Sequence, residues 1–184
     1  MRIISGKYKK RILMTPKDKS IRPTTDRHRE SLFNILDNMN AIIDANVLDL
    51  FSGTGALGIE SLSRGAKSCV FVDHSRKAIQ LIKNNIKHLK IEPTSKVIQC
   101  NILNGLTCLN DTVFDLILMD PPYQKSCINK TLCNIVSQQC LHTDSIIVAE
   151  HADNEPVDVP ETIKQIDTRK YGNTIFRFFQ QIDT

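Results

Sequence analysis

The chain has 184 residues, of which 41% are hydrophobic and 24% are charged, a composition typical of a single soluble globular domain. No apolar run approaches the roughly 20 residues that span a bilayer, and charged residues occupy the N-terminus where a signal peptide needs an apolar stretch. The six cysteines show no CxxC spacing, which argues against a zinc site or a disulfide framework and favours reduced thiols in a cytosolic protein.

Charge is unevenly distributed along the chain. Residues 1–30 contain ten lysines and arginines against three acidic residues, a net charge of +7, whereas the whole chain carries +4. The rest of the chain therefore sums to −3. A basic arm on a mildly acidic body is typical of a protein that binds a polyanion at one end. A solvated tail explains the same charge, so charge alone leaves both interpretations open.

The N-terminal part is predicted to hold a hairpin and a helix. Residues 2–13 contain two short β-prone runs around a Ser-Gly pair, which indicates a small β-hairpin. After a loop, a helix is expected over residues 26–39, because its apolar residues recur at the i, i+3, i+4, i+7 spacing of one buried face. The residues expected in its exposed first turn are Arg27, His28 and Arg29.

From residue 46 onward, strand-like and helix-like patterns alternate. Short apolar runs predict strands at 46–51, 68–73, 96–100, 114–119 and 144–150. Helices are predicted between them at 56–64, 76–90, 101–109 and 127–139. This alternation indicates a parallel sheet that is covered by helices on both faces.

The C-terminal pattern breaks this alternation. Residues 162–181 read as two strands around a Tyr-Gly-Asn turn, which predicts a β-hairpin. The predicted fold is therefore a doubly wound α/β sheet, mostly parallel, that ends in an antiparallel hairpin and carries a small basic hairpin at its N-terminus. We expect the basic arm to comprise residues 1–25 and the sheet domain residues 26–184.

A glycine-rich stretch, DLFSGTGALG, joins the first strand of this sheet to the helix that follows. Gly53, Gly55 and Gly58 satisfy the pattern G-x-G-x-x-G, and Asp73 ends the next predicted strand. Glycines let a ligand approach the backbone, and an acidic residue at that position binds ribose hydroxyls. The loop alone is compatible with a dinucleotide, with an adenosine-containing methyl donor and with a purely structural turn.

Asp49 lies within the first strand of the sheet, shortly before the glycines. Its carboxylate is expected to face the ligand. A carboxylate there suits the cationic amino-acid part of S-adenosylmethionine and repels a pyrophosphate. Asp49 therefore favours a methyl donor over a dinucleotide.

The fourth predicted strand ends in an unusual corner, Asp120, Pro121, Pro122 and Tyr123. Two consecutive prolines offer no N–H donors and have a fixed φ, and an ordinary turn is the simplest explanation. In a doubly wound sheet, however, this corner lies beside the glycine loop, where the strand order reverses. A nucleobase amine that donates to the Asp120 carboxylate and the Pro121 carbonyl would keep its lone pair free for methyl transfer. Tyr123 can stack on such a base.

The stretches DLFSGTGALGIESLSRGA, DPPY and RPTTDRHRESLFNIL together resemble the RsmD family, class I methyltransferases that modify N2 of a guanine in 16S ribosomal RNA. The likeness covers nearly the whole chain. It implies the Rossmann-like class I methyltransferase fold over residues 26–184, S-adenosylmethionine as the cofactor, and a catalytic corner from Asp120 to Tyr123. Many methyltransferases have Asp where this chain has Asn101. The residues implied to bind the cofactor are Asp49, Phe51, Gly53, Gly55, Asp73, His74, Asn101, Ile102 and Asp120.

The expected partner is 16S ribosomal RNA, within the small ribosomal subunit or an assembly intermediate. No metal is expected, and the chain is expected to act as a cytoplasmic monomer. The Asp-Pro-Pro-aromatic motif also serves enzymes that methylate adenine N6 and cytosine N4, so the choice of guanine rests on the resemblance. An adenine N6 methyltransferase, a non-catalytic RNA-binding ribosome-assembly factor and a nicotinamide oxidoreductase are the alternatives. The residues expected to bind RNA are Lys7, Lys9, Lys10, Arg11, Arg22, Thr24, Arg27 and Arg29.

Overall fold

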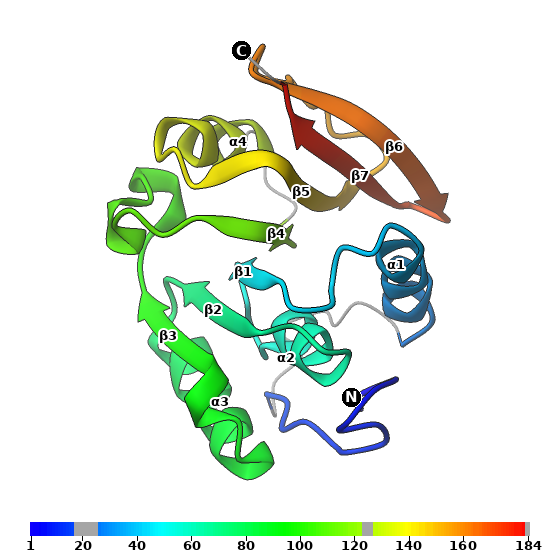
Figure 1. The fold of residues 1–184 in the computed structure, drawn as a ribbon, viewed down its shortest axis with the longest axis vertical. Coiled ribbons are helices and arrows are strands. Elements are labelled where there is room, and N and C mark those ends of the chain that lie inside the picture. The colour runs from blue at the N-terminus through cyan, green and yellow to red at the C-terminus, as the bar shows by residue number, and fades with distance from the viewer. Residues whose placement is uncertain (17–25, 123–126, 183–184) are drawn as a thin grey trace.

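Short apolar runs form one seven-stranded sheet in a computed structural model that describes residues 1–16, 26–122 and 127–182 (Figure 1). The strand order is β3-β2-β1-β4-β5-β7-β6. Strands β1 to β5 run parallel, and β7 pairs antiparallel with both β5 and β6. The strands are β1 (Asn46–Leu50), β2 (Ser68–Asp73), β3 (Ser95–Gln99), β4 (Phe114–Met119), β5 (Leu141–Ala152), β6 (Ile163–Tyr171) and β7 (Thr174–Gln181).

Helices cover both faces of this sheet. The α-helices are α1 (Asp26–Asn38), α2 (Ala56–Ser63), α3 (Arg76–Leu89) and α4 (Cys127–Ser137). Three short 3-10 turns are η1 (Glu92–Thr94), η2 (Ile102–Asn104) and η3 (Thr107–Leu109). In the part of the chain that the structure describes, no helix is both long and apolar enough to cross a membrane.

Two hydrophobic cores lie on opposite faces of the sheet. The first packs α1, α2 and α3 against the sheet around buried aromatic residues such as Phe33, Phe71 and Phe176. The second packs α4, η2 and η3 against the other face and includes Leu132 of α4 and Phe179 of β7. Since burying one such side chain contributes about 1.5–3 kcal/mol, both faces help to fix the strand order. The predicted doubly wound architecture is confirmed.

The register brings the ligand-binding ends of three strands together. β1 lies between β2 and β4, so that Leu50 is opposite Val72 on one side and Met119 on the other. The chain continues from these positions into the glycine loop, Asp73 and Asp120. The order of the strands reverses between β1 and β4, which is where ligands bind in open α/β sheets.

Three predicted segments end or form differently in the structure. β1 stops at Leu50, because Phe51 adopts a left-handed backbone with φ of 58°. The helix predicted at 101–109 is wrong: Gly105, with φ of 118°, separates the two short turns η2 and η3. β5 is longer than predicted, since it begins at Leu141, and its register with β4 shifts between the pairs Phe114–Leu141 and Leu116–Ile146.

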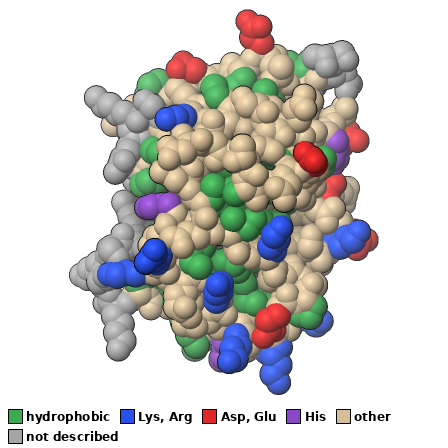
Figure 2. All heavy atoms as spheres, turned by 90° about the vertical axis from the view of Figure 1, so that its left-hand side faces the viewer, with side chains coloured by type: hydrophobic (Ala, Val, Ile, Leu, Met, Phe, Trp, Pro, Cys, Tyr) green, Lys and Arg blue, Asp and Glu red, His purple; other side chains and the backbone are tan. Residues whose placement is uncertain are grey.

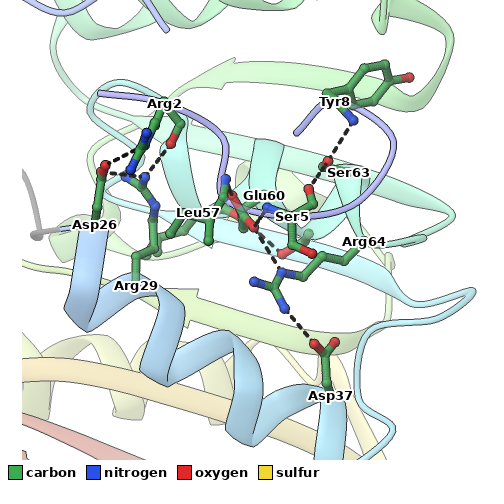
Figure 3. A network of polar contacts seen from close by, with 12 residues as sticks. Arg2, Ser5, Tyr8, Asp26, Arg29, Asp37, Leu57, Glu60, Ser63 and Arg64 are labelled. Atoms are coloured by element: carbon green, nitrogen blue, oxygen red, sulfur yellow. Dashed lines mark hydrogen bonds and ion pairs between the residues drawn. The ribbon is translucent and has the colours of Figure 1, made fainter. Parts of the chain in front are cut away.

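The N-terminal arm folds back on itself and lies against α2, without the two regular strands of the predicted hairpin. One antiparallel bridge joins Arg2 to Ile12. Ile3 and Leu13 are almost fully buried in the first core. Figure 3 shows the polar contacts that hold the arm on α2, chiefly those of Glu60 and Ser63. Residues 1–16 therefore form a docked segment, and the interpretation as a solvated tail does not hold for them.

Candidate active site

The loop after β1 has a backbone that few residues adopt without cost. Phe51, Gly53 and Gly55 have φ angles of 58°, 55° and 78°. The left-handed region suits glycine but is strained for a bulky residue such as phenylalanine. The Ser52 hydroxyl, which donates to the Asp49 carbonyl at 2.5 Å and accepts from Val72 N–H at 3.0 Å, fastens the loop to β2. Local strain of this kind is typical of ligand-binding turns.

Asp73, at the end of β2, holds the same loop from the other side. Its Oδ2 accepts from Gly53 N–H at 3.0 Å, and its Oδ1 accepts from Ser75 N–H at 2.8 Å. The side chain is largely buried at the edge where the loop lies. A carboxylate oxygen has two acceptor sites, so each oxygen can still accept a hydrogen bond from a ligand hydroxyl.

The predicted ligand contact of Asp49 stays a prediction, and the structure shows that its carboxylate has a partner within the protein. Asp49 is 1% exposed, and its Oδ2 accepts from Gly58 N–H at 3.0 Å in the first turn of α2. Burial raises the pKa of this carboxyl to about 7, opposed by the Gly58 hydrogen bond and aided by the nearby Asp73. A Cβ on Gly58 would lie 2.4 Å from the Phe71 ring and 2.5 Å from Cys69 Sγ. Asp49 and Gly58 thus support the loop from beneath.

The residues that follow β2 and β3 border the same edge of the sheet. His74 is exposed and lies beside Asp73, with 3.5 Å between Nδ1 and Oδ1. Asn101 is exposed, and its Oδ1 accepts from Leu103 N–H at 3.2 Å. Ile102 is only 2% exposed and packs in the second core, so its side chain does not line an open surface. Among the residues that the structure describes, no three His, Cys, Asp or Glu side chains are placed to hold a metal ion jointly.

The corner after β4 lies next to the glycine loop. Asp120 is half-buried, Pro121 is buried and Pro122 is exposed. Asp120 directly follows the last paired residue of β4, Met119, whose partner on β1 is Leu50. Tyr123 lies outside the described residues. The structure therefore brings Asp120 and Pro121 beside the loop that contains Gly53 and Gly55.

Seven of the eight residues predicted to bind RNA fall into three groups. Residues 7, 9, 10 and 11 are exposed on the turn of the arm, where Lys7 Nζ and Arg11 Cζ lie 5.5 and 5.8 Å from the centre of the Tyr8 ring. Arg27 is exposed at the start of α1. Two predicted residues, Arg22 and Thr24, lie outside the described residues.

Arg29 was also predicted to bind RNA, but the structure places its side chain inside the fold. It is 1% exposed, and its Nη2 donates to the Arg2 carbonyl at 2.5 Å and to Asp26 Oδ1 at 3.0 Å. Burial lowers the pKa of its guanidinium against the opposing effect of Asp26. The helix turns Arg29 inward, beside the buried Leu32 and Phe33, so it ties α1 to the arm and cannot reach a phosphate on the surface.

Two buried polar residues near the site were missed by the sequence interpretation. Glu60 of α2 is 1% exposed, and Asn85 of α3 is fully buried. The signal was available for Asn85, because the helical period places it on the same face as Ile82, Ile86 and Leu89. A polar residue on an apolar helix face needs hydrogen-bond partners, and both residues find them in the N-terminal arm.

The comparisons with known proteins concern nearly the whole chain. Residues 1–180 match the model of a family described as "Conserved hypothetical protein 95". The Bacillus subtilis protein named "Putative rRNA methyltransferase YlbH" is 42% identical over 179 residues, which cover 95% of each chain. "Ribosomal RNA small subunit methyltransferase D" of Escherichia coli K12 is 31% identical over 182 residues, covering 98% of this chain and 90% of that protein.

A solved structure supports the same relationship. "Putative methyltransferase yhhF from Escherichia coli" superposes with a TM-score of 0.86 at 30% identity, covering 98% of this chain and 97% of that one. The match of the family model over nearly the whole chain, together with these relatives, establishes the relationship. The chain belongs to the RsmD/YlbH family of S-adenosylmethionine-dependent rRNA methyltransferases.

Proposed function

We propose that this chain transfers the methyl group of S-adenosylmethionine to the exocyclic N2 amine of a guanine in 16S ribosomal RNA, in the cytoplasm. The observation that carries the proposal is the pairing of β1 with β4, which sets the Asp120 corner beside the glycine loop. Either element alone is compatible with other functions. Together they offer a donor site and an amine site at one edge of the sheet, and the name of the Escherichia coli relative supports the small-subunit target.

The residues at the loop fit the proposed cofactor. S-adenosylmethionine, when bound, supplies an electrophilic methyl group on a sulfonium. The close-approaching backbone at Gly53 and Gly55 suits a ligand packed against the loop. Asp73 retains acceptor capacity for the ribose hydroxyls at the end of β2. Asn101, exposed after β3, is proposed to border the adenine.

The corner is proposed to hold the amine that receives the methyl group. The lone pair of an exocyclic amine is delocalised into the base, so the amine is a poor nucleophile. Two hydrogen bonds, to the Asp120 carboxylate and the Pro121 carbonyl, would hold the nitrogen closer to tetrahedral. The two prolines fix the position of that carbonyl. Tyr123 is proposed to stack on the extruded base.

The modified nucleoside provides the direct test of this proposal. We expect mass spectrometry of ribosomal RNA nucleosides to show N2-methylguanosine in 16S rRNA from cells with the gene and less of it after deletion. Restoring the gene should restore the nucleoside, whereas a gene with Asp120→Ala should not. If deletion lowered N6-methyladenosine and left N2-methylguanosine unchanged, the target would be adenine and not guanine. An unchanged nucleoside profile after deletion would favour a non-catalytic assembly factor.

Asp73→Ala should weaken binding of S-adenosylmethionine by roughly 1.5–3 kcal/mol, the range for hydrogen bonds to a charged group. Part of the loss would come from freeing Gly53 N–H, which the carboxylate now holds. Asp73→Asn keeps an acceptor and should lose less. Isothermal titration calorimetry measures both. Tight binding of NAD with no binding of S-adenosylmethionine by the unmodified protein would contradict the proposed donor.

Replacing the four cations of residues 7–11 by glutamine should weaken RNA binding and reduce its dependence on salt. If each cation neutralises one phosphate, the slope of log K against log salt should become shallower by about 3 to 4. Deletion of the arm is a poorer test than substitution, because Ile3 and Leu13 are part of the first core. Fluorescence anisotropy with a 16S rRNA transcript at several salt concentrations measures the slope.

A matched control is available on another face of the molecule. Figure 2 shows Lys and Arg side chains over the lower half of the face that carries α3 and β3. Replacing exposed lysines there by glutamine changes the net charge but removes no proposed RNA contact, so the slope should change little. An equal loss of slope in the control would mean that the arm has no special role. The residues of this control are Lys83, Lys87, Lys90 and Lys96.

A further inference from the structure

One buried side chain joins the N-terminal arm to the glycine loop. Asn85 lies on α3 and is fully buried. Its Oδ1 accepts from Met14 N–H at 2.8 Å, and its Nδ2 donates to the Met14 carbonyl at 3.2 Å. The same Nδ2 donates to the Thr54 carbonyl at 2.9 Å. Met14 belongs to the arm, and Thr54 stands between Gly53 and Gly55.

The other end of the arm touches the same loop residue. The Thr54 hydroxyl lies 3.6 Å from the Met1 sulfur, within hydrogen-bond distance. Thr54 is 5% exposed, so the loop side of this contact is shielded from bulk water, whereas Met14 on the arm side is 45% exposed. Since Asn85 uses its acceptor and both of its donors on these two segments, a shift of the loop at Thr54 changes the hydrogen bonds of the arm at Met14.

We propose that Asn85 is a positioning residue that couples the donor site to the N-terminal arm, so that the donor and RNA bind cooperatively. The inference rests on the proposed function, in which the arm binds RNA and the loop binds S-adenosylmethionine. Donor binding fixes the strained turn from Phe51 to Gly55. Through Thr54 and Asn85 the fixed turn holds Met14, and with it the arm that carries the exposed cations.

Coupling of this kind is reciprocal. If RNA tightens donor binding by some factor, the donor must tighten RNA binding by the same factor. Typical couplings amount to about 5- to 150-fold in affinity. Since three hydrogen bonds connect the two segments, we expect a value of about tenfold.

Affinity measurements with an unreactive ligand test the coupling. S-adenosylhomocysteine serves as the probe because it lacks the transferable methyl group, and a 16S rRNA transcript serves as the RNA. In the unmodified protein, RNA should lower the Kd of S-adenosylhomocysteine about tenfold. In Asn85→Ala that factor should fall to nearly one, while RNA affinity without S-adenosylhomocysteine changes less than about twofold, because the cations of the arm remain.

Asn84→Ala is the matched control, since Asn84 is the neighbouring residue on α3 and is exposed. It should keep the full coupling factor. A residue with only a structural role would alter the affinities without altering their ratio. An unmodified protein without coupling, or an Asn85→Ala variant with the full factor, would overturn the inference.

Hydrogen exchange on the unmodified protein provides a second measurement if Asn85→Ala does not fold. Saturation with S-adenosylhomocysteine should slow exchange of the Met14 amide at least several-fold, although Met14 belongs to a different segment from the loop. Binding without any change at Met14 would overturn the coupling and leave the proposed function intact. Absence of binding would overturn both. If the unmodified protein showed the coupling but did not methylate guanine N2, only the proposed function would be contradicted.

Discussion

Asp120→Ala is expected to slow methyl transfer in a single turnover by about a hundredfold or more, the usual effect of removing one positioned electrostatic partner from a reacting group. The carboxylate is proposed to accept a hydrogen bond from the guanine amine, and alanine offers no acceptor. Affinity for S-adenosylmethionine should change far less, because the donor is proposed to lie chiefly against the loop after β1 and Asp73 after β2.

Rapid-quench kinetics with saturating donor and excess enzyme measure this rate, and calorimetry measures the affinity. Asp120→Asn keeps an acceptor oxygen and should retain more activity than alanine. Asp111→Ala, which alters an exposed acidic residue before β4, should transfer at the unmodified rate. The amine becomes acidic only as it is methylated, so the rate should vary little with pH above neutrality. If Asp120→Ala transferred methyl groups as fast as the unmodified protein, the corner after β4 would be a structural turn without a catalytic role.

The centre of the sheet was predictable because β1, β2 and β4 are short, apolar and largely buried. β2 and β4 form at the predicted residues, 68–73 and 114–119, since a parallel strand covered by helices has no polar face to obscure its limits. The convergence of Gly53, Asp73 and Asp120 follows from the same topology. Parallel strands place their carboxyl ends at one edge, and the chain order places β1 between β2 and β4.

Side-chain directions within the site were less predictable. Asp49 precedes the glycines, which predicted a ligand contact, and the sequence did not reveal that its carboxylate also accepts a hydrogen bond from Gly58 N–H of α2. The sequence does not reveal how closely α2 approaches the sheet, a distance that Gly58 makes possible. The prediction for Arg29 assumed that a charged side chain is exposed. Its position on α1, on the same buried face as Leu32 and Phe33, places it inside the fold.

The arm illustrates a different limit. Its composition suggested either a tail or an RNA-binding hairpin, and neither explains how it is held. Its backbone donors at Ile4 and Ser5 are bound by a carboxylate from α2, far away in the sequence. Contacts between a backbone and a distant side chain leave no periodic signal, because any residue at Ile4 or Ser5 other than proline supplies the same N–H.

Glu60→Ala is therefore expected to destabilise the fold strongly, by about 3–5 kcal/mol, the usual cost of removing one partner from a buried ion pair. The Glu60 carboxylate is 1% exposed and accepts from Ile4 N–H at 2.8 Å, Ser5 N–H at 3.0 Å and Arg64 Nε at 2.9 Å. Alanine leaves three partly buried donors without this acceptor. Figure 3 shows that these donors come from the arm and from Arg64, the residue that directly follows α2.

Urea unfolding followed by circular dichroism measures this loss. Glu60→Gln keeps one strong acceptor but adds donors of its own, so it should lie between alanine and the unmodified protein. Glu92→Ala removes an exposed carboxylate and should change stability by less than about 0.5 kcal/mol. Arg64 keeps a second partner in Asp37, so most of the loss should come from the arm, and amides of residues 3–5 should exchange faster even where Glu60→Ala remains folded. Unchanged stability together with unchanged exchange at these amides would mean that other contacts, such as those of Ser63 and Asn85, suffice to hold the arm.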